Sequence, residues 1–217
     1  MGFVIAVDGP AASGKGTIAT RLGTLFQLPV LDSGLLYRAI GLAVTDAGAD
    51  LDSEPDCARA ARAIDYSRLG GPRFRTRAAG EAASRVAVHP AVRQTLIALQ
   101  RAFAAREPGA VIDGRDIGTV IVPDAPAKLY VKASREARAT RRWRQLVKLG
   151  ETVSYGEILA DIQRRDERDA ARDAAPMRPA DDAVLLDTTD LDIEGAFDAA
   201  RRIVEAARGR WEQSQQG

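Results

Sequence analysis

The sequence contains almost no cysteine or histidine, and it has no long apolar run. Cys57 stands alone, which excludes an internal disulfide and every metal motif built on paired cysteines. His89 has no second histidine or cysteine to join it in a metal site or a catalytic triad, so we interpret it as structural. No apolar stretch reaches the roughly 18 residues of a membrane helix, and residues 1–7 lack the basic leader of a secretory signal. We therefore expect a cytoplasmic protein with no membrane partner.

Lysine is also scarce, whereas arginine is abundant. Four of the 31 basic residues are lysines, which leaves 27 arginines, and 30 acidic residues reduce the net charge to +1. Genomic codon bias explains most of this excess, but particular guanidinium groups are also suited to bidentate binding of phosphate. The balanced net charge argues against a nucleic-acid partner.

The 217 residues, of which 46% are hydrophobic and 28% charged, fit one globular domain spanning 1–217, and we expect a monomer. Short apolar runs alternate with stretches of helical spacing, a pattern that predicts a doubly wound α/β fold. The expected strands are residues 3–7, 29–31, 110–112, 128–131 and 183–186. Two segments, 64–80 and 152–179, do not fit this alternation and are candidates for mobile substrate flaps.

A glycine-rich segment lies between the first expected strand and a helix expected over 14–27. Its residues are Gly9, Pro10, Ala11, Ala12, Ser13, Gly14, Lys15, Gly16 and Thr17. Glycines let successive N–H groups converge on phosphate oxygens, the helix dipole adds positive potential, and the lysine reaches the β- and γ-phosphates. We therefore predict an ATP-binding loop, with a chance glycine-rich turn as the alternative. Gly16 occupies the usual hydroxyl position, so the candidate Mg²⁺ ligand is Thr17, one residue later.

A second phosphate site is expected after the second strand. Ser33 is positioned to cap a helix expected over 34–47, and Tyr37 and Arg38 lie within a turn or so of its start. A hydroxyl and a guanidinium would then flank any phosphate held at that helix terminus. An ordinary capped helix with a surface arginine is the alternative.

Residues 111–116 end another expected strand and deliver Asp113, Arg115 and Asp116 to the same edge of the sheet. P-loop enzymes place here the carboxylate that holds Mg²⁺ or its waters, which makes Asp113 a candidate metal ligand. Arg115 is a candidate clamp for the transferring phosphoryl group. A turn with incidental charges is the alternative.

Two arginine-rich stretches flank the turn at 150–155. Residues 135–148 hold six cations and one acid, and Arg165, Arg168, Asp169 and Arg172 share one face of the following helix. Either stripe alone would indicate a solvated face. Together they predict a lid, spanning about 141–175, that excludes water and brings arginines such as Arg165 and Arg172 to the reacting phosphoryl group. An arginine-rich site without a histidine base suits an acceptor that is already an anionic phosphate.

These motifs resemble, in order, those of the bacterial-type cytidylate kinases, from about Val4 to Arg202. The matching stretches are VDGPAASGKGT, LDSGLLYRA, AAS at 82–84, HPAVR at 89–93, DGRDIGTVIVPDAPAKLYV and RRDERDAAR at 164–172. The resemblance implies a P-loop three-layer α/β/α fold with a five-stranded parallel sheet, a monophosphate-binding flap at about 36–93 and a helical lid. It also implies transfer of a phosphoryl group from ATP to CMP or dCMP, with Mg²⁺.

The resemblance further implies the roles of acceptor-site residues. Positions matching Ser84, Arg93 and Asp169 would contact the cytosine ring, and Asp116 would lie near the ribose. The residues that would serve the acceptor phosphate or the lid are Ser33, Arg38, Arg115 and Arg172. These residue types suit cytosine, because a carboxylate accepts from its N4 amino group while serine and arginine donate to its ring acceptors.

The sequence departs from the family pattern in the flap. The family carries a small antiparallel sheet there, whereas residues 64–80 are short and contain Gly70-Gly71-Pro72. We therefore expect a reduced flap, with Ser84 and Arg93 beyond the shortened segment.

Two other functions are compatible with the phosphate-binding loop. One is a kinase for a different small acceptor, which the pair Asp169 and Arg93 disfavours. The other is a nucleotide-dependent switch, which the absence of an Asn-Lys-x-Asp motif and the unexplained acceptor-side arginines disfavour.

Overall fold

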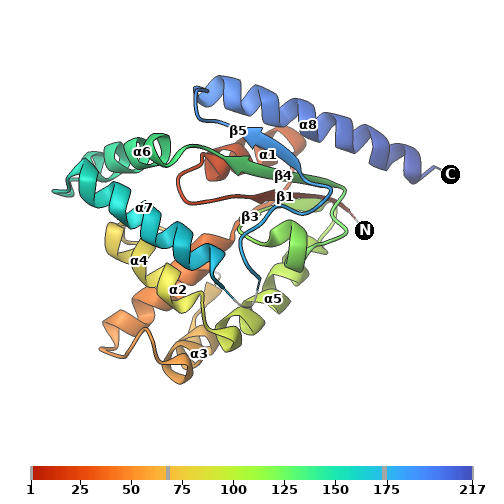
Figure 1. The fold of residues 1–217 in the computed structure, drawn as a ribbon. Helices are drawn as coiled ribbons and strands as arrows, with labels where there is room; N and C mark the ends of the chain where they lie inside the picture. The colour runs from red at the N-terminus through yellow and green to blue at the C-terminus, as the bar shows by residue number, and fades with distance from the viewer. Residues whose placement is uncertain (1, 67–68, 173–174, 217) are drawn as a thin grey trace.

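The computed structural model describes residues 2–66, 69–172 and 175–216, and its centre is one sheet of five parallel strands (Figure 1). The strands are β1 (Phe3–Asp8), β2 (Val30–Asp32), β3 (Gly109–Gly114), β4 (Ala127–Lys132) and β5 (Val184–Asp187). They lie in the order β2-β3-β1-β4-β5, and every pair is parallel. Parallel neighbours need crossover connections, which helices supply here. The α/β prediction with five parallel strands is therefore confirmed.

The middle strand is β1, because its sequence allows burial on both faces. All six of its residues are buried. Val7 pairs with Asp113 of β3 and with Leu129 of β4, so the carboxyl ends of these three strands meet at one edge of the sheet. That edge is where open parallel sheets bind their ligands.

Helices cover the sheet and extend beyond it. They are α1 (Lys15–Phe26), α2 (Ser33–Asp46), α3 (Glu54–Ala63), α4 (Arg77–Val86), α5 (Pro90–Ala104), α6 (Arg135–Lys148), α7 (Tyr155–Ala170) and α8 (Ile193–Ser214), with a 3-10 turn η2 (Pro72–Arg75) and a π-helical turn η3 (Ile117–Ile121). The helices expected over 14–27 and 34–47 are confirmed within one residue at each end.

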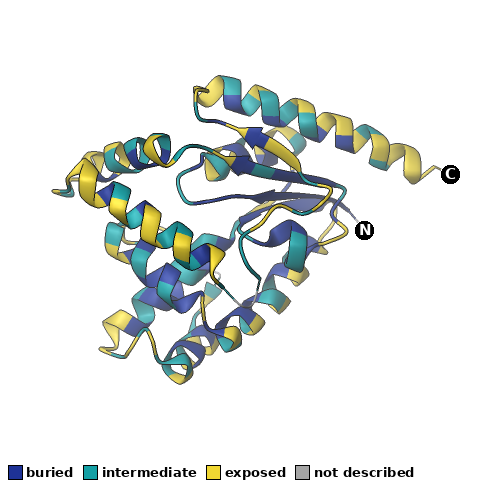
Figure 2. Ribbon diagram, viewed as in Figure 1, coloured by how far each residue is buried: buried dark blue, intermediate teal, exposed yellow. Residues whose placement is uncertain are grey.

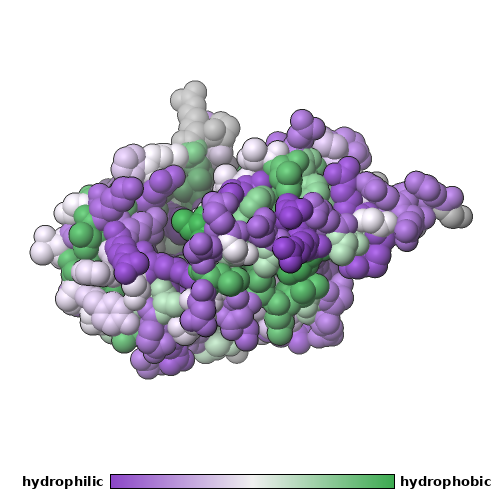
Figure 3. Space-filling view, turned by 90° about the horizontal axis from the view of Figure 1, so that it is seen from above, coloured by the Kyte–Doolittle hydropathy of each residue, from purple (hydrophilic) through white to green (hydrophobic). Residues whose placement is uncertain are grey.

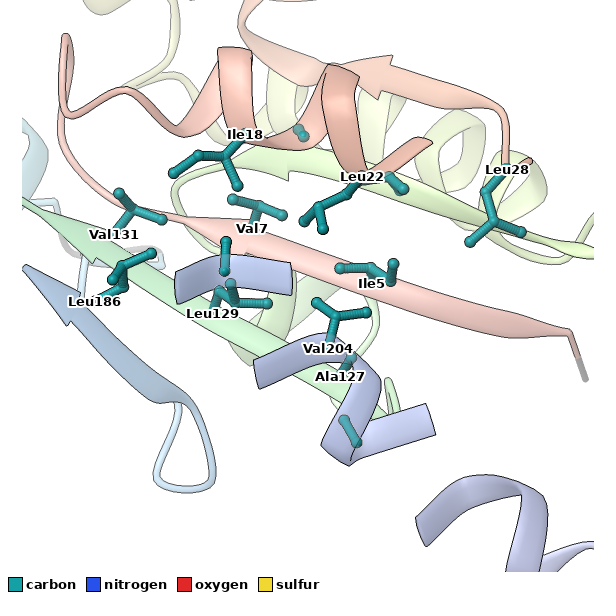
Figure 4. Close-up of a cluster of buried hydrophobic side chains, with 14 of the residues drawn as sticks. Ile5, Val7, Ile18, Leu22, Leu28, Ala127, Leu129, Val131, Leu186 and Val204 are labelled. Atoms are coloured by element: carbon teal, nitrogen blue, oxygen red, sulfur yellow. The ribbon is translucent and has the colours of Figure 1, made fainter. Parts of the chain in front are cut away.

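The two faces of the sheet have separate apolar clusters. On one face Ile5 packs with Ile18 and Leu22 of α1 and with Val204 of α8 (Figure 4). On the other face Val4 and Ala6 belong to a cluster with Ala104 of α5 and with Ile117. Burying a Leu or Ile side chain contributes roughly 1.5–3 kcal/mol, so these clusters fix the sheet that carries the site.

Helices α2 to α5 form a third apolar unit in the region expected to be the flap. Leu36 and Ile40 of α2 pack with Val86 and Leu96. His89 is buried there, and its Nε2 donates to the Leu51 carbonyl oxygen at 2.9 Å, which fits its structural interpretation. Within 64–66 and 69–80 the chain forms η2 and the start of α4 and contains no strand. Residues 67–68 of the expected flap lie outside the described residues.

Helices α6 and α7 form a hairpin in the region expected to be the lid. Leu146 packs against Ile158 and Ile162, and Trp143 Nε1 donates to the Val153 carbonyl oxygen at 3.0 Å. The sheet is buried throughout its centre, whereas the tip of this hairpin is exposed (Figure 2). Residues 173–174, near the end of the expected lid, lie outside the described residues.

The helices are amphipathic where they meet solvent. Hydrophilic side chains predominate on the face seen from above in Figure 3, with smaller apolar patches between them. Among the described residues, no helix combines the length and the apolar character needed to cross a membrane.

Candidate active site

The glycine-rich loop connects the buried end of β1 to the start of α1. Gly9 has φ 144°, and a Cβ atom there would lie 2.0 Å from the Val131 carbonyl oxygen, so only glycine fits. Ala12 and Gly14 also have positive φ, 61° and 95°. The strand, the curled loop and the helix provide the context that a phosphate-binding loop requires.

Lys15, the first residue of α1, lies beside Asp113 at the end of β3. Lys15 Nζ and Asp113 Oδ1 are 3.1 Å apart, and both side chains are largely buried. Burial lowers the pKa of Lys15 and raises that of Asp113, and the opposite charge of each partner counteracts the shift of the other. The pair thus forms a preorganised charged centre between β1 and β3.

A hollow of about 120 Å³ lies between the loop and the helices α4, α6 and α7. Its cationic lining residues are Lys15, Arg38, Arg77, Arg115, Arg142 and Arg165. Burial lowers the pKa of Arg165 to about 9, the neighbouring Arg115 adds to this shift, and Arg165 Nε has no hydrogen-bond partner. Burial, followed by repulsion from Arg38, lowers the pKa of Arg142 to about 10. Burial is thus the main cause of both depressed pKa values, and the repulsion between neighbouring guanidinium groups adds to it. Glu81 and Asp161 also line this hollow, and a bound phosphoryl group would supply further negative charge.

A second hollow, of about 230 Å³, opens beside the first and reaches between α2, α4 and α7. The buried pair Arg93 and Asp116 lies along it, and Arg93 Nη1 donates to the Tyr37 hydroxyl at 3.5 Å. Burial raises the pKa of Tyr37 to about 12, so its hydroxyl stays protonated. Ser33 and Ser84 are both buried along this hollow. The hollow therefore has donors and acceptors on several sides, as a nucleoside needs.

Asp169 lies between two guanidinium groups in the same hollow. Arg115 Nε donates to Asp169 Oδ2 at 3.2 Å, and Arg172 pairs with Asp169 Oδ1. Burial alone would raise the pKa of Asp169, but the charges of Arg115 and Arg172 outweigh it and hold the pKa below its ordinary value. A carboxylate has about four lone-pair sites, so Asp169 retains capacity for another donor.

Several polar atoms at the site are buried and unpaired. They include Ser13 Oγ, Ser84 Oγ, Arg165 Nε and Arg172 Nε. A buried group without a partner costs about 1–3 kcal/mol, and folded proteins contain few of them. Ser84 and the two arginines line the hollows, so a bound ligand could satisfy them.

The residues proposed for a metal fit Mg²⁺ by their chemistry. Thr17 and Asp113 both line the second hollow, and Thr17 is exposed to solvent. Their side chains offer a hydroxyl and a carboxylate oxygen as ligands. Mg²⁺ retains several waters and binds through one or two protein oxygens together with substrate phosphates. The described residues contain no group of three or more His, Cys, Asp or Glu placed to hold a metal by themselves. The set therefore fits an ion that arrives with a nucleotide.

One local expectation was wrong. The N-cap of α2 is Asp32, whose Oδ1 accepts from the Leu35 N–H at 3.2 Å, whereas Ser33 is the first helical residue. Asp32 Oδ2 also lies 3.6 Å from Arg38 Nη1. The extended conformation of Asp32 lets it act both as strand end and as cap, which leaves the buried Ser33 hydroxyl to the hollow.

The two arginine stripes are only partly solvated, because Arg135, Arg144 and Lys148 are exposed whereas other members face protein. Arg138 is buried and forms a two-bond pair with Asp166, at 2.9 and 2.6 Å. Arg168 pairs with Glu81, and Arg165 is turned into the first hollow. Arg172 lies two residues beyond the last residue of α7, yet its side chain still reaches Asp169. The solvated-face alternative is therefore incorrect for Arg138, Arg165, Arg168 and Arg172, and it holds for the exposed members of the first stripe.

A third hollow and a buried carboxylate were not predicted. The hollow, of about 600 Å³, lies on the other side of the loop and is lined in part by Arg141, Thr188, Leu191 and Ile193. Thr188 Oγ1 donates to the Ser13 carbonyl oxygen at 2.8 Å, and it directly follows β5. The rule that ligands lie at strand carboxyl ends, applied to the fifth strand, would have identified this segment.

The unpredicted carboxylate is Asp8, the last residue of β1. Its two oxygens accept from the N–H groups of Ile117 and Gly118, each at 2.8 Å. Asp8 therefore fixes the start of η3, directly after Arg115 and Asp116. The Asp-Gly pair at the end of the strand was the available signal.

Comparison with known proteins supports one family. The family model for cytidylate kinase matches residues 5–206. A curated cytidylate kinase from Caulobacter sp. (strain K31) is 65% identical, over 97% of this chain and 98% of the relative. One from Xanthobacter autotrophicus (strain Py2) is 58% identical, over 95% of this chain and 99% of the relative. Because both alignments cover nearly all of each partner, these relatives have almost the same length as this chain.

A solved structure supports the fold alone. An uncharacterized protein from Eubacterium ventriosum aligns with a TM-score of 0.54 at 15% identity, over 94% of this chain and 98% of that chain. The match to the family model and the identity to full-length relatives show that this chain belongs to the cytidylate kinase family.

Proposed function

We propose that this protein transfers the γ-phosphoryl group of ATP to CMP or dCMP, giving ADP and CDP or dCDP, with Mg²⁺. The observation that carries the proposal is the cationic hollow between the phosphate-binding loop and the hollow that holds Asp169. A phosphoryl group passing from donor to acceptor would cross this hollow. Family membership supports the same reaction.

In this reaction the loop at 9–17 would hold the donor phosphates through its backbone N–H groups. Lys15 would bind the β- and γ-phosphates, and Asp113 beside it keeps the ammonium oriented in the buried site. Mg²⁺, when bound with ATP near Thr17 and Asp113, would neutralise phosphate charge. The third hollow, between the loop and residues 188–193, is the available space for the donor base.

The second hollow would hold the acceptor nucleoside. Asp169 would accept from the cytosine N4 amino group, while Ser84 and Arg93 would donate to ring acceptors. Uracil presents the opposite pattern and would leave buried groups unpaired, at about 1–3 kcal/mol each. Asp116, held by Arg93, would lie near the ribose.

The acceptor phosphate would bind between the two hollows, where both are lined by Arg38 and Arg115. Ser33 at the start of α2 adds a hydroxyl there. Arg165 and Arg172, from α7 and the residues after it, would stabilise charge on the transferring group. The acceptor oxygen is already anionic, so no residue has to act as a strong base.

Three broader expectations accompany this proposal. The chain would act as one P-loop kinase domain, with a flap at about 36–93 and a lid at about 141–175. We further predict a monomer in the cytoplasm. Sedimentation of the purified protein and cell fractionation would measure these two properties.

The test is ADP formation by purified protein with ATP and Mg²⁺, using CMP, dCMP, UMP, AMP, GMP or no acceptor in turn. We expect strong turnover with CMP and dCMP, its loss in Asp169→Asn, and its retention in the exposed control Asp198→Asn. ATP binding without turnover on any acceptor would instead favour a nucleotide-dependent switch.

A further inference from the structure

Helices α4 and α7 belong to different parts of the chain but lie side by side (Figure 1). At the first residue of α4, Arg77 Nε and Nη2 donate to the two oxygens of Asp161, at 2.5 and 3.2 Å. Arg77 Nη1 also donates to Glu157 at 3.2 Å, and its backbone N–H donates to Glu151 at 3.0 Å. One flap residue thus contacts three carboxylates of the hairpin.

A second ion pair follows one turn further along α4. Arg168 Nη2 of α7 donates to Glu81 Oε1 at 2.9 Å. Between the two pairs lies Gly80, where an added Cβ would lie 3.6 Å from Arg165 Nη1. This is an ordinary van der Waals distance, so the guanidinium of Arg165 packs directly beside α4 at this level.

The same two helix faces continue into the acceptor hollow. Arg77, Glu81 and Ser84 are spaced by four and three residues along α4, and Asp161, Arg165 and Asp169 by four along α7. Ser84 and Asp169 both line the second hollow. The ion pairs and the nucleoside-facing residues therefore form successive levels of one helix–helix contact.

The hairpin also contacts the donor side of the site. Arg138 Nη1 and Arg141 Nη1 of α6 each donate to loop carbonyl oxygens, those of Ala11 and Ser13, at 3.4 Å. Arg142 Nη2 donates to the carbonyl oxygens of Arg75 and Thr76, at 3.2 and 3.0 Å, directly before α4. Donor binding at the loop thus has a physical connection through α6 and α7 to α4.

An isolated exposed ion pair contributes little, but a shared network of several carboxylates around one arginine fixes a geometry. Burial is partial here, since the Arg77 and Asp161 side chains are 35% and 23% exposed. Partly exposed ion pairs of this kind can form and break without a large free-energy cost, as parts that move during turnover require.

We infer that Arg77 is a positioning residue whose pairing with Asp161 makes the flap and the lid close as one unit, so that donor and acceptor nucleotides bind cooperatively. The inference rests on the proposed kinase function. Since Ser84 and Asp169 move with their helices, the pair sets the width of the acceptor hollow although it does not contact the base.

The experiment measures CMP affinity by calorimetry, with and without a non-hydrolysable ATP analogue and Mg²⁺. We expect the analogue to tighten CMP binding to the unmodified protein by about fivefold or more. In Arg77→Ala the factor should fall close to one, and Asp161→Ala alone or combined with it should give the same loss. The matched control is Arg73→Ala, whose partner Asp46 lies on α2 and not on the hairpin. A factor unchanged in Arg77→Ala, or equally lowered in Arg73→Ala, would overturn the inference.

A second readout separates this inference from the proposed reaction. Hydrogen exchange of residues 79–86 is measured with the ATP analogue and Mg²⁺ alone, without any acceptor. Protection of this helix in the unmodified protein but not in Arg77→Ala supports the link even if CMP proves to be the wrong acceptor. Equal protection in both proteins contradicts the link even if CMP is phosphorylated.

Discussion

The β1–loop half of the site and the α4–α7 half are stabilised by different forces. All six residues of β1 are buried, and the loop that follows is fixed by backbone geometry such as the close approach of Gly9 to Val131. The contact between α4 and α7 consists largely of partly exposed ion pairs, with unpaired groups in the hollow beneath it. Apolar burial suits a cradle that must stay in place, whereas ion pairs suit parts that must separate at each turnover.

The largest expected effect comes from removing the Lys15 charge in the β1–loop half. Lys15→Ala should lower kcat by about 10²–10³-fold, because a preorganised cation at the reacting phosphates is lost. Lys132→Ala is the control, since Lys132 pairs with Asp187 and both side chains are half exposed. Steady-state ADP formation measures both variants. A near-normal kcat in Lys15→Ala would mean that the arginines of the α4–α7 half are sufficient to stabilise the reacting phosphates.

A smaller effect, in the α4–α7 half, distinguishes a loss of acceptor binding from a loss of folding stability. Ser84→Ala should raise the KM for CMP by about fivefold, the value of one hydrogen bond, without loss of folding stability, because the buried hydroxyl has no partner in the protein. The control is Thr119→Val, which removes another buried unpaired hydroxyl, on η3. It should change neither the KM for CMP nor the folding stability. Acceptor kinetics and urea unfolding check the pair. A stability loss in Ser84→Ala with unchanged KM would contradict the assignment of Ser84 to the acceptor site.

The pH dependence of folding stability tests the pKa of Asp8 in the β1–loop half. Burial raises its pKa to about 7, against the opposing effect of the Gly118 and Ile117 hydrogen bonds. Because the folded pKa exceeds the unfolded value of 3.8, the folded state binds the extra proton between these values. This residue therefore makes the free energy of unfolding fall as pH rises towards 7, by up to about 1.4 kcal/mol per pH unit, and adds no slope above that.

Asp8→Asn removes this titration. The unfolding free energy of the variant, minus that of the unmodified protein, should increase from pH 5 to pH 7 and then level off. Urea unfolding at closely spaced pH values measures the difference. Parallel curves would indicate that Asp8 stays ionised when folded.

A further small effect concerns backbone strain in the loop. Ala12 has φ 61°, a left-handed conformation that costs a residue with a Cβ about 1 kcal/mol. Ala12→Gly should raise the unfolding free energy by about that amount. Ala11→Gly, at a neighbouring position without positive φ, should lower it. Thermal unfolding measures both, and equal shifts would show that loop strain is not the cause.

The sequence predicted the β1–loop half of the site better than the α4–α7 half. The run Phe3–Val7, the strand ends and the loop follow from local composition, and the structure confirms the strands and helices built on them. The roles assigned to the site residues stay predictions, although Arg93, Asp116 and Asp169 do line one hollow. The pairing of Arg77 with Asp161 joins residues 84 positions apart, and periodicity carries no information about such a contact.

Local rules also failed where one residue had two possible uses. Serine is a residue type that favours N-caps, yet Asp32, the residue before Ser33, caps α2 because β2 ends there in an extended conformation. The arginine stripes have the spacing of a solvated face, and only the packed structure identifies the carboxylates that bind them.

The hydrogen bond from Trp143 to the backbone of Val153 gives the hairpin an intrinsic fluorophore. The chain has two tryptophans, and Trp211 is in α8, where its ring lies 5.4 Å from that of Phe3. Replacing Trp211 by phenylalanine would leave Trp143 as the one tryptophan, so tryptophan emission, excited selectively over tyrosine, would arise only from the hairpin. Opening of the hairpin could then be followed in real time, in solution and without a chemical label.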